Sequence, residues 1–328
     1  MLDGITILDL STVGPGSRCT WLLADLGADV VKIAAPPSAG RIDPPFHSYG
    51  AGRGTRRIEI DLKADKQAFL DLAATADAIV ESYRPGVADR LGIGYEAVRA
   101  VNERIVYAAV TGYGQTGPSA SWAGHDLNYL AVSGYLACQG NELPGATVAD
   151  SAGGGMQAAI SILAALLRRE RTGEGAYLDV STTNGVLYLM ALQIDQYLAT
   201  GEEAAPGTTL LTGRYACYDV YPCRDGKWVS VGAIEGQFFR NLCRTLECEQ
   251  YAARQFDDDA QDEIRATLRA AFATKDRDDW VAELAPQDTC IAPILSVSEV
   301  PDRFAELVQE VTHPQHGSFR QLGPLVAR

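Results

Sequence analysis

Apolar and polar positions follow two alternating periods over the first third of the chain. Short, continuous apolar runs predict buried strands, and between them apolar residues recur at helical spacing. The expected strands are residues 5–10, 29–33, 57–62, 78–81 and 105–111. The expected helices are residues 17–26, 66–75, 87–91 and 95–101. This alternation with short connections indicates a mostly parallel sheet with helices on both faces, which binds ligands at the carboxyl ends of its strands.

The pattern changes between residues 112 and 155, where glycine and other small residues are frequent and apolar periods are few. We expect an irregular stretch here, and such a long stretch inside a compact domain is more often a binding region than a simple connection. A strongly apolar helix is expected at residues 156–169, then a strand at 177–181 and a long helix at 186–198.

A second region has a different pattern. Strands at residues 214–221 and 228–233 flank the turn Cys-Arg-Asp-Gly-Lys and predict a hairpin. Helices are expected at residues 238–246, 262–274 and 278–284. We therefore predict an α/β fold with four parts along the chain. They are a large domain (1–200), a linker (201–213), a small α+β domain (214–300) and a segment that returns toward the large domain (301–328).

Composition narrows the class of protein. The 328 residues are 47% hydrophobic and 21% charged, which is typical of a folded globular chain. The net charge of −14, most of it between residues 245 and 310, argues against broad contact with nucleic acid or an anionic membrane. The start has no basic segment followed by an apolar one, and no apolar run reaches ~18 residues. We expect a cytoplasmic protein without nucleic-acid or membrane partners.

The seven cysteines are scattered and contain no Cys-x-x-Cys pair. An odd number at such spacing predicts free thiols in a reducing compartment. No His or Cys cluster has the spacing of a zinc site, so no metal is expected.

The turn after the first expected strand is rich in glycine, as dinucleotide-binding turns are. Residues 13–16 read Val-Gly-Pro-Gly, with a proline between the glycines and no third glycine at the required spacing. Residues 32–35 read Lys-Ile-Ala-Ala and lack the carboxylate that would hold a ribose. A nicotinamide or flavin site is therefore not expected.

Basic side chains gather near the expected strand ends of the first 110 residues. They are Arg53, Arg56, Arg57, Lys63, Arg84 and Arg90. A ligand with several phosphates would bind at such strand ends. Solvated surface side chains without a ligand explain the same pattern equally well, so both interpretations stay open.

Three acidic or basic positions are candidates for chemistry. His125 stands beside Asp126 in a glycine-bounded segment, which favours proton transfer, although a lone histidine is more often structural. Asp150 precedes Ser-Ala-Gly-Gly-Gly and an apolar helix. In one interpretation, Asp150 is part of an ordinary helix start. In the other, it is a carboxylate beside open backbone N–H groups that hold an oxyanion, and the glycines let a ligand approach the backbone. Glu235 stands at the end of an expected strand, where it is either a candidate for chemistry or an ordinary acidic residue at the start of a helix.

Several motifs in order resemble the family III CoA-transferases, and within them the α-methylacyl-CoA racemases. The segments that carry the resemblance are LLADLGADVVK (22–32), DLK (61–63), ESYRPG (81–86), GYGQTGP (112–118), GHDLNY (124–129), Asp150 with its glycines, and GAIE (232–235). Together they span most of the chain.

The resemblance implies a Rossmann-like large domain, a small domain and an interlocked homodimer with shared active sites. It implies coenzyme A as part of an acyl-CoA substrate, with no other cofactor, against Lys63, Arg84 and Arg90. Its other implied contacts are Ile60, Asp61, Leu62, Ser82, Tyr83, Gly124, Leu127, Asn128 and Tyr129. The implied catalytic residues are His125, supported by Glu235, and Asp150, with Asp126 nearby.

Three departures from the family accompany the resemblance. Ala34 and Ala35 replace an acidic and a basic residue, so a contact to the adenine or 3′-phosphate end is missing unless Arg41 supplies it. Residues 211–215 read Leu-Thr-Gly-Arg-Tyr, which predicts a different acyl pocket. Relatives often extend beyond the position of Arg328, so a trailing segment is expected to be absent.

Three functions follow. Two bases on opposite sides of the α-carbon would invert a 2-methylacyl-CoA thioester by proton transfer. Alternatively, Asp150 would act as nucleophile in CoA transfer to a free carboxylic acid. The third is a CoA-binding protein without catalysis, which the presence of His125, Asp150 and Glu235 disfavours.

Overall fold

The computed structural model describes residues 1–36, 54–313 and 317–324, so Arg41 and Arg53 lie outside the described residues. The chain forms two compact units. The first contains Met1–Leu136, Asn141–Asp195 and Leu307–Arg328, and the second contains Ala137–Gly140 and Gln196–Glu306.

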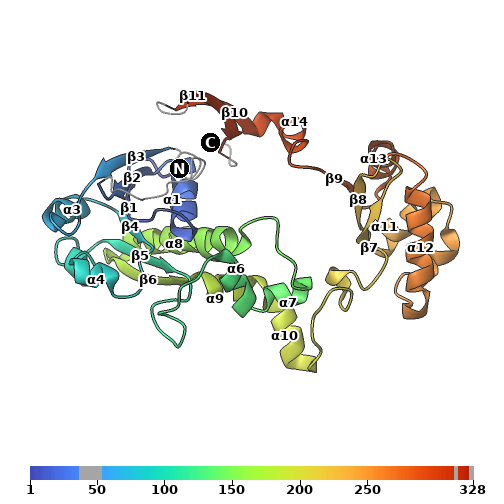
Figure 1. The fold of residues 1–328 in the computed structure, drawn as a ribbon, viewed down its shortest axis with the longest axis horizontal. Coiled ribbons are helices and arrows are strands. Elements are labelled where there is room, and N and C mark those ends of the chain that lie inside the picture. The colour runs from blue at the N-terminus through green and yellow to red at the C-terminus, as the bar shows by residue number, and fades with distance from the viewer. Residues whose placement is uncertain (37–53, 314–316, 325–328) are drawn as a thin grey trace. The chain divides into compact units, whose positions relative to one another are not determined.

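A six-stranded parallel sheet organises the first unit (Figure 1). Its strands are β1 (Thr6–Asp9), β2 (Asp29–Ala34), β3 (Thr55–Glu59), β4 (Ala78–Glu81), β5 (Val106–Thr111) and β6 (Ala176–Ser181). Their spatial order is β3-β2-β1-β4-β5-β6, so the order reverses between β1 and β4. Open parallel sheets bind ligands at this reversal, beyond the carboxyl ends of the strands. The predicted Rossmann-like α/β fold is confirmed.

Helices cover both faces of the sheet because successive strand residues point to opposite sides. Ile7, Val80 and Val106 pack with α1 (Pro15–Asp25) and α8 (Gln157–Thr172). Leu8 and Ile79 pack on the other face with α3 (Lys66–Ala73), α4 (Val87–Leu91) and α5 (Tyr95–Arg99). Burying an aliphatic side chain in this way stabilises the fold by about 1.5–3 kcal/mol.

The stretch 112–155 is not irregular as expected. It contains α6 (Asp126–Val132), α7 (Tyr135–Gln139) and the π-helix η1 (Ala149–Met156). Glycine lowers helix propensity, but the glycines of η1 are buried against α1 and α9, so tertiary packing overrides local preference.

Two other boundaries differ from the prediction. The helix expected at 186–198 is two helices, α9 (Thr182–Leu189) and α10 (Ala191–Thr200). The N–H of Met190 is shared between the carbonyls of Val186 and Leu187, which tightens the last turn of α9 and ends it. The strand expected at 57–62 is shifted toward the N-terminus, because residues 61–65 form a turn capped by the Asp61 carboxylate.

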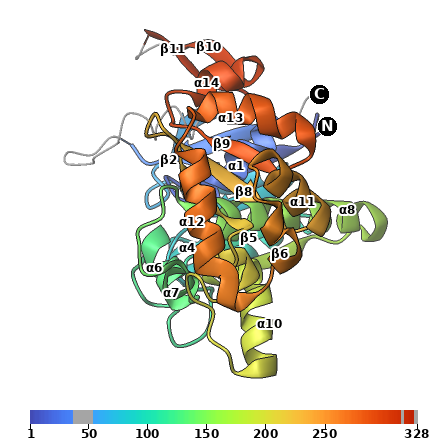
Figure 2. The ribbon, with the colours of Figure 1, turned by 90° about the vertical axis from the view of Figure 1, so that its right-hand side faces the viewer.

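The second unit is built on the predicted hairpin of β7 (Tyr218–Pro222) and β8 (Trp228–Gly232). β9 (Ile291–Ile294), which was not predicted, adds a third antiparallel strand. β7 begins later than expected because Arg265 binds the carbonyls of Gly213 and Arg214 and holds them outside the sheet. α11 (Gly236–Thr245), α12 (Gln261–Phe272) and α13 (Arg277–Leu284) complete the unit (Figure 2).

Shorter elements link these parts. Short 3₁₀ turns lie at Leu210–Thr212, Glu249–Arg254, Asp258–Ala260, Ala285–Gln287 and Ala305–Leu307. After α14 (Val300–Arg303), β10 (Val308–His313) pairs antiparallel with β11 (Gly317–Leu322). No helix within the described ranges has the length and apolarity to cross a bilayer. All seven cysteines are free thiols.

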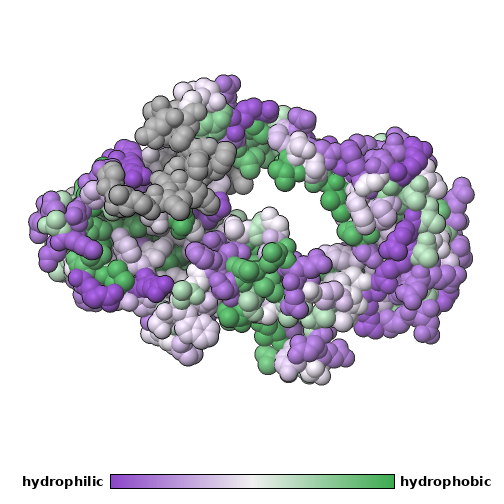
Figure 3. Space-filling view, in the orientation of Figure 1, coloured by the Kyte–Doolittle hydropathy of each residue, from purple (hydrophilic) through white to green (hydrophobic). Residues whose placement is uncertain are grey.

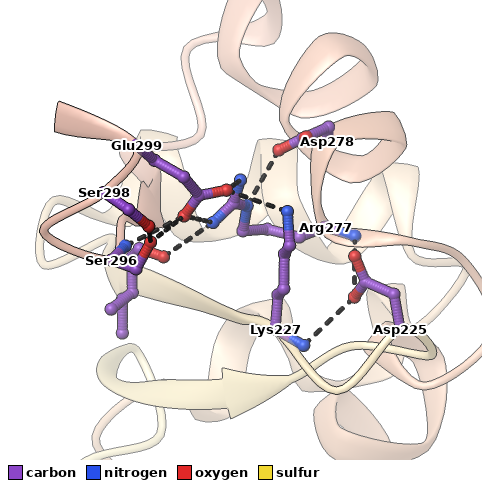
Figure 4. Close-up of polar contacts among 8 residues, drawn as sticks. Asp225, Lys227, Arg277, Asp278, Ser296, Ser298 and Glu299 are labelled. Carbon is purple, nitrogen blue, oxygen red and sulfur yellow. Dashed lines mark hydrogen bonds and ion pairs between the residues drawn. The ribbon is translucent and has the colours of Figure 1, made fainter. Parts of the chain in front are cut away.

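A buried arginine ties the end of β9 to the rest of the second unit (Figure 4). Arg277 donates to both carboxylate oxygens of Glu299, at 3.0 and 2.8 Å, and to the carbonyl of Ile294 at 2.8 Å. Lys227 donates to the same carboxylate at 2.8 Å. These cations hold the pKa of Glu299 well below its ordinary value, so the carboxylate stays charged and fixes the segment that follows β9.

Candidate active site

A cavity of about 660 Å³ opens at the carboxyl ends of β1, β4 and β5 in the first unit. It is lined by the loops after β1 and β4, at residues 12–15 and 82–85, and by the end of β5 with the residues after it, at 110–113. The rest of its wall comes from the segment before and within α6, and from Asp150. The cavity therefore includes the point where the strand order reverses, as expected for a ligand site in this fold.

The loop after β1 is held by a buried carboxylate that sequence reasoning missed. Asp9 accepts hydrogen bonds from the N–H and the hydroxyl of Ser11, at 2.7 and 2.5 Å, and from Thr20 at 2.7 Å. Lys32 neutralises it at 3.0 Å. These contacts fix the direction in which residues 12–15 enter the cavity. Asp9 was not singled out because its partners come from two other elements.

Asp150 lies in the first turn of η1 with its carboxylate facing the loop after β1. A Cβ on Gly14 would lie in ordinary contact with the Asp150 Oδ2 atom, at 3.6 Å, and the φ of +78° at Gly14 is what favours glycine there. The N–H of Asp150 donates to Asp126 Oδ1 at 2.8 Å. This bond places Asp126 beside the catalytic candidate, as expected.

The environment of Asp150 raises its pKa to about 6. Burial contributes most, since it disfavours the charged form, and the Asp126 carboxylate adds to the effect. Arg18 and His125 act in the opposite direction and lower the Asp150 pKa. A carboxyl group with this pKa exchanges protons readily near neutral pH.

His125 stands at the start of α6 and lines the same cavity. The backbone N–H of His125 donates to Asn128 Oδ1 at 3.0 Å, and this bond caps the helix. The Tyr129 hydroxyl donates to the carbonyl of Gly124 at 2.6 Å and so closes the segment on itself. Burial raises the pKa of Tyr129 to about 12, so the hydroxyl keeps this proton. The GHDLNY segment therefore fixes the backbone that carries the imidazole.

An aromatic wall, not foreseen from the sequence, borders the cavity. The Tyr113 ring packs edge-on against Trp122, with ring centres 5.8 Å apart, and against Tyr129 at 5.1 Å. A Cβ on Gly112 would lie 2.2 Å from the Tyr129 ring, so only glycine fits between them. The clustering of aromatic residues around 112–129 was visible in the sequence, but their contact was not.

The glycines that follow Asp150 do not admit a ligand, which corrects the expectation. A Cβ on Gly154 would lie 2.4 Å from Pro15, one on Gly153 would lie 2.8 Å from the carbonyl of Thr182, and one on Gly155 would lie 2.6 Å from Arg18. Two N–H groups at the start of η1 are also occupied, because that of Asp150 binds Asp126 and that of Ser151 binds the carbonyl of Thr147. The glycines serve close packing against α1 and α9.

Comparison with known proteins decides the family. The model of CoA-transferase family III matches residues 2–327. The chain belongs to CoA-transferase family III. It is 33% identical to the α-methylacyl-CoA racemase of Homo sapiens over 97% of this chain and 82% of the relative. It is 30% identical to the succinyl-CoA:glutarate CoA-transferase of Mus musculus over 99% of this chain and 80% of the relative.

A solved structure of a family member has the same fold. The CaiB/BaiF family protein from Brucella suis superposes with a TM-score of 0.81 at 26% identity, covering 100% of this chain and 92% of that one. Racemases and transferases are thus similar to this family III chain to about the same degree.

The structure brings together only part of the predicted family III site. Eight predicted residues line the cavity: Ser82, Tyr83, Arg84, Gly124, His125, Asn128, Tyr129 and Asp150. Seven others do not: Ile60, Asp61, Leu62, Lys63, Arg90, Asp126 and Leu127. Glu235 lies in the second unit at the start of α11, exposed and without a side-chain bond to that helix. Its support of His125 stays a prediction.

Coenzyme A carries phosphate groups, and the basic side chains differ in how free they are to bind them. Arg84 is exposed at the cavity, and its guanidinium makes no hydrogen bond or ion pair within the described ranges. Arg56 is paired with Asp29 through two bonds of 3.0 and 2.7 Å. It is the second residue of β3, and Arg57 is the middle residue, so neither lies at the carboxyl end where a ligand would bind. Their expected place at a ligand-binding strand end is therefore corrected.

Proposed function

We propose that this family III member interconverts the two configurations of 2-methylacyl-CoA thioesters by α-proton transfer. The placement of His125 and Asp150 on the wall of one cavity carries the proposal, because inversion at carbon needs two groups that exchange protons. The pKa of about 6 at Asp150 supports it, since both protonation states are accessible near neutral pH.

In the reaction, one base removes the proton from the carbon next to the thioester carbonyl. The electron pair of the broken C–H bond moves toward the carbonyl oxygen and gives a planar enolate. The other base, in its protonated form, returns a proton to the opposite face. We assign His125 and Asp150 to these two roles, with Asp126 tuning Asp150 and Glu235 orienting the imidazole. Coenzyme A enters as part of the substrate, and the proposal requires no further cofactor.

The coenzyme A moiety is proposed to lie along the carboxyl edge of the sheet. Arg84 is the cationic contact nearest the cavity, with Ser82 and Tyr83 beside it. Lys63 and Arg90, with residues 60–62, are proposed to bind the parts of the ligand that extend beyond the cavity. Both relatives have a CoA thioester in their names, which supports a CoA ligand for this chain.

A homodimer is part of the proposal. Ile160 and Leu167 of α8 form one exposed apolar stripe at helical spacing with Met156, which directly precedes that helix. Tyr188 and Leu192 are 78% and 59% exposed. Figure 3 shows apolar side chains gathered over the part of the molecule where α6 and α10 lie. Patches of this kind mark interfaces in soluble proteins.

A second function is CoA transfer between an acyl-CoA and a free carboxylic acid. The similarity to the mouse succinyl-CoA:glutarate CoA-transferase favours it. Asp150 would attack the thioester carbonyl, form an acyl-aspartyl anhydride and release the CoA thiolate, which then attacks the aspartyl carbonyl to give an aspartyl-CoA thioester and a free acid. An acceptor carboxylate reverses these steps. This route has no evident use for His125.

Proton NMR in deuterium oxide distinguishes the two. One epimer of a 2-methylacyl-CoA is incubated with the protein and no acceptor acid. We expect loss of the α-proton signal, appearance of the other epimer, and a decrease of at least ~10² in rate for His125→Ala. Asp71→Asn, on the exposed side of α3, is the matched control and should leave the rate unchanged. Retained racemisation in His125→Ala, or acyl transfer without exchange once an acid is added, would contradict the two-base proposal.

A further inference from the structure

Each of the three strands beneath the cavity ends in a side chain that binds the loop after it. The Asp9 carboxylate accepts from the N–H of Ser11, and the Thr111 hydroxyl accepts from the N–H of Gly114 at 3.0 Å. Between them, the Glu81 carboxylate at the end of β4 accepts from the N–H of Tyr83 at 2.6 Å. The reaction described above uses Asp150 and His125 but gives Glu81 no role.

Glu81 is the buried anchor of the loop that carries the cationic contact. Its side chain is 4% exposed, while Ser82, Tyr83 and Arg84, which follow it, all line the cavity. Ser82 is also fixed from the other side, because its hydroxyl lies 2.3 Å from the position that a Cβ on Gly16 of α1 would occupy. The direction of Arg84 into the cavity therefore depends on the hydrogen bond between Glu81 and Tyr83.

The charge on Glu81 is not balanced as that on Asp9 is. Lys32 pairs with Asp9, whereas the charged group that acts on Glu81 is the Asp89 carboxylate of α4. The charge of Glu81 in turn raises the pKa of the neighbouring phenols of Tyr83, Tyr107 and Tyr177. Burial raises the pKa of Glu81 to about 7, the hydrogen bond from the Tyr83 N–H partly opposes this effect, and the charge of Asp89 adds a smaller upward contribution.

We propose that Glu81 is a positioning residue whose carboxyl group fixes loop 82–85 and takes up a proton when the phosphate-bearing part of coenzyme A binds against that loop. A second negative charge brought near a buried carboxylate favours its neutral form. The neutral acid still accepts the Tyr83 hydrogen bond through its carbonyl oxygen. In the binding equilibrium, the protein, one ligand molecule and one proton then combine. The proposal rests on the function proposed above, because it requires a CoA ligand.

Calorimetric titration of the protein with free coenzyme A at pH 7.5, in two buffers of different ionisation enthalpy, measures this proton. We expect wild type to take up about half a proton more per ligand than Glu81→Gln, which is permanently neutral. The affinity of wild type should weaken as pH rises from 6 to 8, while that of Glu81→Gln stays nearly level. His125→Ala and Asp150→Asn should retain the extra uptake, which separates Glu81 from the two catalytic groups.

Two further variants separate positioning from stability. Glu81→Leu removes the acceptor for the Tyr83 N–H and should weaken coenzyme A binding at least tenfold. Asp77→Asn is the matched control, because Asp77 immediately precedes β4, accepts from the Thr6 N–H at 2.8 Å and pairs with Arg169 at 2.9 Å, but does not line the cavity. It should lower the melting temperature without changing affinity.

The possible results decide between the two proposals. Equal proton uptake in wild type and Glu81→Gln, or unchanged affinity in folded Glu81→Leu, would overturn the role of Glu81 alone. If Glu81→Leu does not fold, the comparison with Glu81→Gln still decides. Wild type that binds coenzyme A without racemising thioesters would contradict the proposed reaction and leave the role of Glu81 standing. Wild type that does not bind coenzyme A would contradict both.

Discussion

At the scale of single residues, the carboxylate of Asp150 lines the cavity, and that of Asp126 lies beside it outside the cavity wall. Asp126 accepts the backbone N–H of Asp150, and its charge helps to keep the Asp150 pKa at about 6. As a base, Asp150 works only when deprotonated, so proton removal by Asp150 falls as pH drops below about 6. In the opposite direction it must donate, and that rate falls as pH rises above the same value.

Asp126→Asn tests this arrangement. The carboxamide oxygen still accepts the Asp150 N–H, but the negative charge is gone, so the pKa of Asp150 falls. For the epimer from which Asp150 removes the proton, the pH below which the rate falls should therefore be lower than in wild type. The rate at pH 5 should be about 2- to 5-fold above that of wild type. Deuterium incorporation from each epimer between pH 4.5 and 8 measures it. An acid limb that stays in place, or one that moves equally in Asp71→Asn, would contradict the role of Asp126.

At the scale of elements, Asp150 is held by glycine packing between η1 and α9. A Cβ on Gly185 of α9 would lie 1.7 Å from the carbonyl oxygen of Gly153. That contact is with backbone, so no side chain can move aside. The close approach of the two backbones therefore fixes the position of the π-helix, a rare element that is frequent at functional sites.

Gly185→Ala should therefore be strongly destabilising, by about 1–3 kcal/mol or more, because the two helices must separate. Thermal unfolding measures the loss. Gly145→Ala is the matched control, since a Cβ there meets nothing within 4 Å, and it should leave the melting temperature nearly unchanged. Equal melting temperatures for the two variants would show that α9 and η1 are not in such close contact.

The sequence predicted the parallel sheet because its strands are short, continuous apolar runs, as in β5, where all six residues are buried. It did not predict η1 or α6, because one is glycine-rich and the other is short and begins with polar residues. His125 and Asp150 were found through motifs that surround them. Asp9, Glu81 and the role of Gly14 were missed because each acts through a contact that only the folded chain creates.

At the scale of the whole molecule, the chain is two units with separate cores, and the proposed reaction draws on residues of both. The predicted support of His125 by Glu235 therefore concerns two different units. We assign that carboxylate to the shared active site of the proposed homodimer, so the proposal links assembly to catalysis.

The apolar stripe of α8 gives the corresponding prediction. Ile160 and Leu167 are each 59% exposed, and replacing both with Glu places charge in the proposed interface. Light scattering after size exclusion should show the mass of a dimer for wild type and of a monomer for the double variant, with a parallel loss of racemisation. Val101→Glu, at a side chain 43% exposed beyond α5, should remain dimeric. A wild-type monomer with full activity would rule out the shared site.

The contrast between the two sides of the cavity has a practical consequence for redesign. Positions 153–155 and 185 have no room for any side chain, so a mutant library there would yield misfolded chains and no new catalysts. Trp122, 55% exposed on the aromatic wall, carries no such restriction. Changes of substrate preference, whether selected in nature or in the laboratory, should accumulate on that wall while the residues around Asp150 stay fixed.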